Sequence, residues 1–145
     1  MTIEYSAIPQ ELAEMEAYHM YGPIKEFLDW TDGRYIWEDI IDGLNDGTLS
    51  LWLAYEVAEG GSPLRIGGCL VRINHYAKTQ VLHVEALFSI HKKGRDWVEG
   101  MINLLEEYAK DMGCEKIEAR GRIGWRRFVD RVGWKETSAF WEKDL

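Results

Sequence analysis

The chain has 145 residues, with 25 acidic against 17 basic side chains and 46% hydrophobic residues. A chain of about 150 residues buries roughly two thirds of its unfolded surface, so its core needs neither disulfides nor a metal. The apolar content excludes a disordered chain, and no apolar run approaches the ~20 residues that cross a bilayer. We therefore expect one folded domain over residues 1–145, with no membrane contact.

The start of the chain and its cysteines indicate the compartment. Residues 1–10 lack the basic start and apolar stretch of a signal peptide. Cys69 and Cys114 are the two cysteines, and a pair in such a chain is more typical of free thiols than of a disulfide. We expect an intracellular, cytoplasmic protein.

The net charge of −8 divides unevenly along the chain. Residues 1–60 hold 13 acids and two bases, a net −11, whereas residues 61–145 hold 12 acids and 15 bases, a net +3. An anionic partner is therefore expected on the second part and a cationic partner on the first. The first part is equally consistent with a solvated acidic layer.

The first third of the chain, residues 1–47, has helical periodicity and is acidic. Apolar spacing predicts helices over 9–20, 24–30 and 36–44, with turn residues between them. The remainder, 48–145, is expected to form the sheet and its core.

Short apolar runs replace the helical spacing in the middle of the chain. The runs 51–57, 65–73 and 79–90 predict three successive antiparallel strands, separated by Gly-rich or polar loops.

The last third returns to alternating helices and strands. Its clearest helix covers 95–112 and stops at Gly113, followed by a strand over 114–121, a helix over 124–132 and a strand over 135–144. This order predicts an α/β (α+β) fold, with helices on both faces of a mixed central sheet.

The element order, the strand, polar loop and helix over 81–112, and the ending 121–134 together resemble the GNAT superfamily of acyl-CoA-dependent N-acyltransferases. The likeness covers about residues 30–145. The pairs Gly113-Cys114, Gly121-Arg122, Gly124-Trp125 and Gly133-Trp134 are most similar to small GNAT-like proteins of tailed bacteriophages, some of which are thought to be virion-associated.

The resemblance implies an acyl-CoA site at the start of the long helix, where unpaired backbone N–H groups and the helix dipole attract phosphates. The family's loop pattern falls on His91, Gly94 and Asp96, of which Gly94 alone matches fully. The implied cofactor-binding residues are Leu87, Ser89, His91, Lys92, Lys93, Gly94, Arg95, Asp96 and Arg122.

Three positions depart from the family pattern. Asp96 places a carboxylate beside the phosphates, and it also suits the cap of a helix that starts at Trp97. Arg122 stands where the family commonly has Asn, and Val129 where it commonly has the Tyr that protonates the leaving thiolate. Tyr108 and Tyr76 are the remaining phenols, and both are more typical of structural roles.

His83 and Glu85 are the candidate catalytic residues. Strand alternation predicts that both point, with Leu87, to one face beside the cofactor loop. The resemblance implies that a Glu or His on this strand takes a proton from the acceptor amine. The alternative is a His–Glu pair that satisfies itself inside a half-buried sheet.

The sequence thus predicts an N-acetyltransferase that moves an acyl group from acetyl-CoA to an unknown amine or protein acceptor. The alternative is a catalytically silent GNAT-fold phage protein, virion-associated or protein-binding, in the host cytoplasm or the virion, with virion proteins or a second copy of the chain as partners. No metal is expected, since His75, His83 and His91 lie far apart. Nucleic acid is not expected, because the chain is acidic.

Overall fold

The computed structural model describes residues 2–90 and 96–145. A five-stranded mixed sheet forms its centre, in the order β1-β2-β3-β4-β5. Its strands are β1 (Thr2–Ala7), β2 (Ser50–Val57), β3 (Leu64–His75), β4 (Gln80–Ser89) and β5 (Lys116–Ala119). All neighbours pair antiparallel except β4 and β5, which are parallel.

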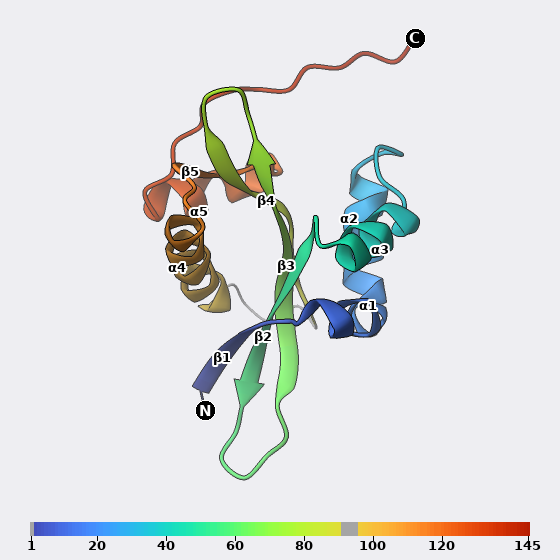
Figure 1. Cartoon of the computed structure of the whole chain (residues 1–145), viewed down its shortest axis with the longest axis vertical. Helices are drawn as coiled ribbons and strands as arrows, with labels where there is room; N and C mark the ends of the chain where they lie inside the picture. Colours follow the sequence, from blue (N-terminus) through green and yellow to red (C-terminus); the bar gives the residue numbers. More distant parts are fainter. Residues whose placement is uncertain (1, 91–95) are drawn as a thin grey trace.

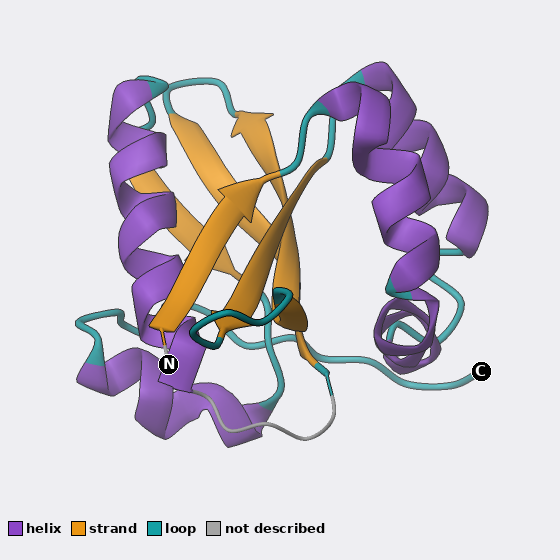
Figure 2. Cartoon of the chain, turned by 90° about the horizontal axis from the view of Figure 1, so that it is seen from below, coloured by secondary structure: helices purple, strands orange, loops and turns teal. Residues whose placement is uncertain are grey.

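Helices cover both faces of this sheet. On one side lie α1 (Gln10–His19), α2 (Tyr21–Trp30) and α3 (Trp37–Asp46), and on the other α4 (Asp96–Asp111) and α5 (Arg126–Arg131), as Figures 1 and 2 show. The short 3-10 turn Ile123–Trp125 precedes α5. The predicted mixed sheet with helices on both faces is confirmed.

Each face of the sheet has its own hydrophobic core. One core joins α1–α3 to the sheet through residues such as Met20, Leu44 and Phe88. The other joins α4 and α5 to the sheet through residues such as Trp97, Leu105 and Phe128. The sheet therefore fixes both helical layers relative to the same strands.

Three glycines end helices where the sequence predicts. Gly47, Gly113 and Gly133 follow α3, α4 and α5 with φ of +83°, +78° and +88°. Glycine adopts this left-handed conformation without the steric cost that a Cβ imposes.

Strand β1 was not predicted, although its residues alternate. It pairs antiparallel with β2, Ile3 opposite Glu56 and Tyr5 opposite Ala54. The Tyr5 hydroxyl donates a 2.8 Å hydrogen bond to the Trp97 carbonyl, which ties this edge strand to the first turn of α4.

The predicted strand over 135–144 is wrong: in the described part of the chain this stretch forms no sheet ladder. It crosses toward the α2–α3 loop instead (Figure 1). There the Arg34 guanidinium donates a 2.6 Å hydrogen bond to Glu142, and the Arg120 guanidinium lies 4.7 Å from the centre of the Phe140 ring. Side-chain contacts, which alternation does not encode, hold this segment.

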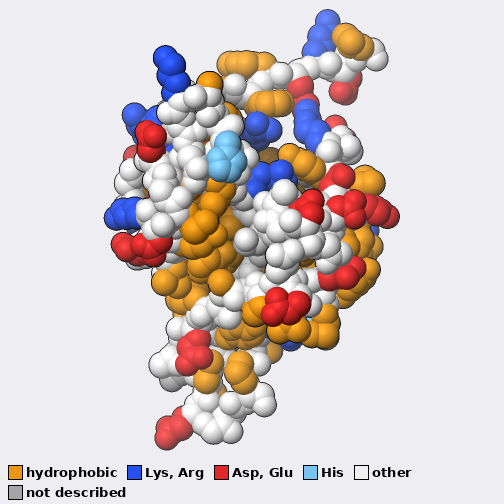
Figure 3. Space-filling view, in the orientation of Figure 1, with side chains coloured by type: hydrophobic (Ala, Val, Ile, Leu, Met, Phe, Trp, Pro, Cys, Tyr) orange, Lys and Arg blue, Asp and Glu red, His pale blue; other side chains and the backbone are white. Residues whose placement is uncertain are grey.

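The two cysteines are free, as predicted. Cys69 is fully buried in β3, and burial raises the pKa of its thiol. No helix of the described residues is long and apolar enough to cross a membrane. Figure 3 shows several acidic side chains over the helical side that carries α1–α3.

Gly67 of β3 leaves room for the Trp97 ring of α4 against the sheet. A Cβ at this position would overlap the buried Trp97 ring and lie 2.9 Å from the Phe88 carbonyl oxygen. We expect Gly67→Ala to lower the free energy of unfolding by about 1–3 kcal/mol, and each kcal/mol to lower Tm by roughly 2–4 °C. The control Gly124→Ala meets no atom within 4 Å and should leave Tm unchanged. Equal Tm values for the two variants in calorimetry would contradict this packing.

Candidate active site

A β-bulge at Glu85 sets the geometry of the site. Val84 pairs with Val71 of β3 and Ala86 pairs with Leu70, so Glu85 is the extra residue of β4. A bulge of this kind re-aims a side chain and bends its strand.

As strand alternation predicts, His83 and Glu85 lie on one face of the sheet, the face that α1–α3 cover, with their side chains in contact. The bulge changes the alternation only after Glu85. It thereby corrects the prediction for Leu87. Leu87 packs with the core on the α4 side, whereas Ala86 and Phe88 belong to the core on the α1–α3 side. The extra residue shifts the alternation, and Leu87 therefore points away from His83 and Glu85.

Glu85 also marks the point where β4 and β5 part. Their parallel pairing runs from Val81 opposite Lys116 to Val84 opposite Ala119, where β5 ends. Strand β4 continues to Ser89. The stretch 85–89 therefore has no described strand beside it on the β5 side, and its backbone polar groups can pair with another extended chain or ligand.

Five side chains form what we call the β4 polar cluster: Tyr35, Arg72, His83, Glu85 and Glu118. Arg72 Nε lies 3.0 Å from Glu85 Oε2, and His83 Nε2 lies 3.4 Å from the same oxygen. His83 Nδ1 lies 3.7 Å from Glu118 Oε2 on β5. Among Arg72, His83, Glu85 and Glu118, the side chain of Glu85 is the most deeply buried, with 7% exposed.

Tyr35, from the loop between α2 and α3, completes the cluster. Burial raises the pKa of its phenol, and the charge of Glu85 and a hydrogen bond to that carboxylate raise it further. Tyr35 is therefore protonated at neutral pH and able to donate to Glu85.

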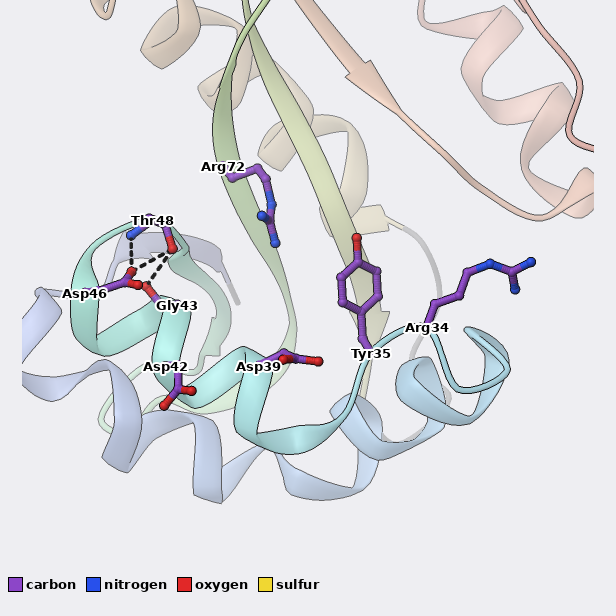
Figure 4. Close-up of a pocket in the computed structure, with 8 residues that line it drawn as sticks. All are labelled: Arg34, Tyr35, Asp39, Asp42, Gly43, Asp46, Thr48 and Arg72. Carbon is purple, nitrogen blue, oxygen red and sulfur yellow. Dashed lines mark hydrogen bonds between the residues drawn. The ribbon is translucent and has the colours of Figure 1, made fainter.

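A cavity of about 340 Å³ opens between α3 and β3, in front of Tyr35 and Arg72 (Figure 4). The residues that line it are Arg34, Tyr35, Asp39, Asp42, Gly43, Asp46, Thr48 and Arg72. Glu85 does not line this cavity, and Tyr35 and Arg72 contact both the cavity and Glu85.

Three carboxylates of α3 give the cavity its charge. Asp46 accepts hydrogen bonds from the hydroxyl and backbone N–H of Thr48 at 2.6 and 2.8 Å, which lower its pKa. Asp39 accepts a 2.9 Å bond from the Ile36 backbone N–H, and Asp42 also faces the cavity. Arg34 extends away from these acids (Figure 4).

Two of the predicted cofactor residues, Ser89 and Asp96, lie where the end of β4 meets the start of α4. Ser89 accepts a 3.3 Å hydrogen bond from the Trp97 indole, so the end of β4 and the first turn of α4 are in contact. Asp96 is exposed and adds a negative charge at the start of α4. The helix begins at Asp96 itself, one residue earlier than the start at Trp97 that the predicted cap role assumed. The predictions for His91, Lys92, Lys93, Gly94 and Arg95 lie outside the described residues.

The other residues considered for cofactor binding or proton donation contact side chains outside the His83–Glu85 pair. Arg122 is exposed, and its guanidinium lies 5.5 Å from the centre of the Trp30 ring at the end of α2. Val129 packs against the α4-side core, where Tyr108 also meets Trp52 edge-on with ring centres 5.2 Å apart. Tyr76 is exposed and donates a 2.9 Å hydrogen bond to Glu118.

Sequence reasoning missed Tyr35, Arg72 and Glu118. The hairpin register could have indicated Arg72, because Arg72 pairs directly with His83. Likewise, Glu118 pairs with His83 across the parallel strands. No sequence signal brings Tyr35, from a loop, to Glu85. Among the described residues no group of three or more His, Cys, Asp or Glu side chains is arranged to hold a metal ion.

The buried Glu85 carboxylate depends on Arg72 for compensation. We expect Arg72→Met to lower the free energy of unfolding by about 2–4 kcal/mol, because it leaves a charge unpaired inside the protein; the range allows for Arg72 being 32% exposed. Chemical denaturation measures this change. The matched control is Lys25→Met, which breaks an exposed ion pair with Asp29. A loss no larger for Arg72→Met than for Lys25→Met would contradict the assignment.

Comparisons with known proteins identify the fold. Scans against protein-family models and against curated proteins each find no match to the sequence. Solved structures do match along the whole chain. A predicted acetyltransferase with acetyl-CoA from Clostridium acetobutylicum is 15% identical with a TM-score of 0.69, covering 99% of this chain and 97% of that one.

Two further structures agree with it. A GCN5-related N-acetyltransferase from Ralstonia eutropha JMP134 is 14% identical with a TM-score of 0.69, covering 99% of each chain. AAC(6')-Iy in complex with the bisubstrate analogue CoA-S-monomethyl-acetylneamine is 18% identical with a TM-score of 0.68, covering 100% of each chain. At these identities the likeness concerns architecture, and the chain has the fold of the GCN5-related N-acetyltransferases.

Proposed function

We propose that this protein is a single-domain N-acetyltransferase that moves the acetyl group of acetyl-CoA to a cationic amine. The observation that carries the proposal is the β4 polar cluster. It supplies a buried carboxylate and an imidazole at the point where β4 and β5 part, within an acetyltransferase fold.

Two features support acyl-CoA as the donor. Solved structures of this fold hold acetyl-CoA and a CoA-containing bisubstrate analogue. In this chain the backbone of 85–89 is open on the β5 side, so an extended pantetheine arm could pair with it as a strand does. Leu87 and Ser89 lie on that stretch, and Asp96 begins α4 next to it. We assign acyl-CoA binding to these residues, to 91–95 and to Arg122.

Glu85 and His83 are the proposed proton acceptors. Attack of a neutral amine on the thioester carbonyl forms a C–N bond and leaves a proton on the nitrogen. A positioned carboxylate or imidazole takes that proton. The C–S bond breaks and releases CoA as its thiolate, which water protonates. Tyr35 and Arg72 hold Glu85 in place, so the carboxylate needs no reorientation during the reaction.

The α3 cavity supports a cationic acceptor. Asp39, Asp42 and Asp46 place negative charge along one wall, and Tyr35 at the other side contacts Glu85. Such a wall attracts ammonium groups and repels acidic amines. The acceptor we propose therefore carries at least one positive charge beyond the reacting nitrogen, as a polyamine or a lysine-bearing peptide does.

A thermal-shift titration followed by a transfer assay tests the proposal. Acetyl-CoA at 100 times its Kd should stabilise the protein by about 2.7 kcal/mol, and desulfo-CoA should also bind. With acetyl-CoA present, spermidine should be acetylated faster than an acidic amine such as glutamate. Glu85→Gln should lower kcat/KM by about 10²–10⁴-fold while leaving the acetyl-CoA shift intact, and Glu59→Gln, in the exposed β2–β3 loop, should match the wild type.

The outcomes separate this proposal from the alternative. No thermal shift at millimolar acetyl-CoA contradicts it. A shift without transfer to any amine favours a catalytically silent GNAT-fold protein that binds other proteins.

Three features of the structure favour a catalytically silent protein that binds other proteins. Asp96 is exposed at the start of α4, and Val129 offers no proton donor. Tyr18 and Tyr21 are exposed and contact the Trp37 ring at an angle, with ring centres 5.4 and 5.0 Å away. Exposed aromatic side chains are typical of a surface that binds protein. Binding to phage virion proteins or to a second copy of the chain rests on the sequence resemblance, and mass spectrometry of purified particles would test the former.

A further inference from the structure

We propose that Glu118 is the proton exit of the active site, and that it acts through His83. The inference rests on the proposed function and adds a route to it: from Glu85 through the His83 imidazole to Glu118, and from there to water. Glu118 is a positioning residue in this scheme, since it touches His83 and not the reacting atoms.

The three side chains stand in a row across two strands. The two nitrogens of His83 face opposite ways, Nε2 toward Glu85 at 3.4 Å and Nδ1 toward Glu118 at 3.7 Å. Residues 83 and 118 are direct partners in the parallel pairing of β4 and β5. The backbone itself therefore holds the imidazole beside the second carboxylate.

A neutral His83 cannot satisfy both carboxylates of this row at once. Nδ1 of His83 is buried without a hydrogen-bond partner among the described residues. A neutral imidazole has one N–H, and here two carboxylates face it, so one of the two contacts always lacks a proton. A proton that arrives at His83 gives both ring nitrogens an N–H, and both contacts become attractive pairs between opposite charges.

Burial gives the route a direction. The side chain is 7% exposed in Glu85, 14% in His83 and 39% in Glu118. A proton that moves along the row thus travels from the interior toward solvent, and it reaches water at Glu118 without crossing the α3 cavity.

The surrounding groups leave this route open. Arg72 on β3 pairs with Glu85 and accepts no proton. Tyr35 contacts Glu85 from the α2–α3 loop. Tyr76 donates to Glu118 Oε1 at 2.9 Å, which leaves Oε2 facing His83. Asn74 in turn donates to the Tyr76 hydroxyl at 3.2 Å, and both fix the Glu118 carboxylate.

One proton travels from the amine to water in each turnover. Glu85 takes a proton from the nitrogen of the attacking amine and passes it to His83 Nε2. His83 releases the proton on Nδ1 to Glu118 Oε2, and Glu118 gives it to water. Each carboxylate returns to its anionic form, and the imidazole returns to its neutral form as the opposite tautomer. Exchange of the ring protons with water restores the starting tautomer before the next turnover.

The test uses the full-length protein with acetyl-CoA and the best amine found, under conditions where proton release limits the rate. Glu118→Gln keeps an acceptor for Tyr76 but takes up no proton, and it should lower kcat roughly ten- to hundredfold with acetyl-CoA binding unchanged. Glu118→Ala should lose a similar factor and regain activity as formate is added at constant ionic strength. The control is Glu115→Ala, an exposed residue just before β5, which should keep wild-type activity with or without formate.

A second readout needs no substrate. The ring ¹⁵N resonances of His83 report which nitrogen carries the proton. Glu118→Gln should shift them in the ligand-free protein, and Glu115→Gln should not.

The results separate the two proposals. If the wild-type protein transfers acetyl groups, any one of three results overturns the relay and leaves the proposed function standing. These are full activity in Glu118→Gln, no response of Glu118→Ala to formate, and His83 resonances that do not change in Glu118→Gln. A wild-type protein that transfers no acetyl group overturns the proposed function and the relay with it.

Discussion

The structure of the candidate site depends on one buried negative charge, the carboxylate of Glu85. Only 7% of that side chain is exposed, and a charge at such a depth must be compensated by partners. Arg72 supplies the countercharge from β3, Tyr35 donates from the α2–α3 loop, and His83 contacts the same oxygen from β4. One carboxylate thus ties two strands of the sheet to the helical layer above them. Its position at a bulge, where β4 and β5 part, makes the same interaction a candidate for chemistry.

Periodicity predicted most of the architecture. Helices, central strands and glycine stops were correctly placed because each depends on local spacing. Strand β1 was missed because its half-exposed alternation is weak, and the strand over 135–144 was wrong because pairing depends on a neighbouring edge that local sequence does not encode.

The candidate site was only partly predictable for the same reason. Alternation brought His83 and Glu85 together correctly, but it misplaced Leu87, because a bulge inserts a residue that no periodic pattern reveals. Arg72 and Glu118 follow from strand register, and Tyr35 follows only from the tertiary fold. Such non-local contacts decide which polar residues share a site.

The uneven charge of the chain acquires a more specific meaning in the fold. Acids from the first part, Asp39, Asp42 and Asp46, line the cavity beside the polar cluster. Some described bases of the second part are already in contact with other side chains. Arg120 and Arg122 lie over aromatic rings, and Arg65 pairs with Glu16. The charge division therefore supports a cationic acceptor more strongly than it supports the binding of nucleic acid.

Amide hydrogen exchange with and without acetyl-CoA tests the central claim most directly, because it locates the donor on the chain. If the donor pairs with the open side of β4, peptides that cover 85–89 and the start of α4 should exchange more slowly when acetyl-CoA is bound, while peptides from β1 should not change. Unchanged exchange at 85–89 with saturating acetyl-CoA, or protection confined to another surface, would contradict an acetyl-transfer site at Glu85.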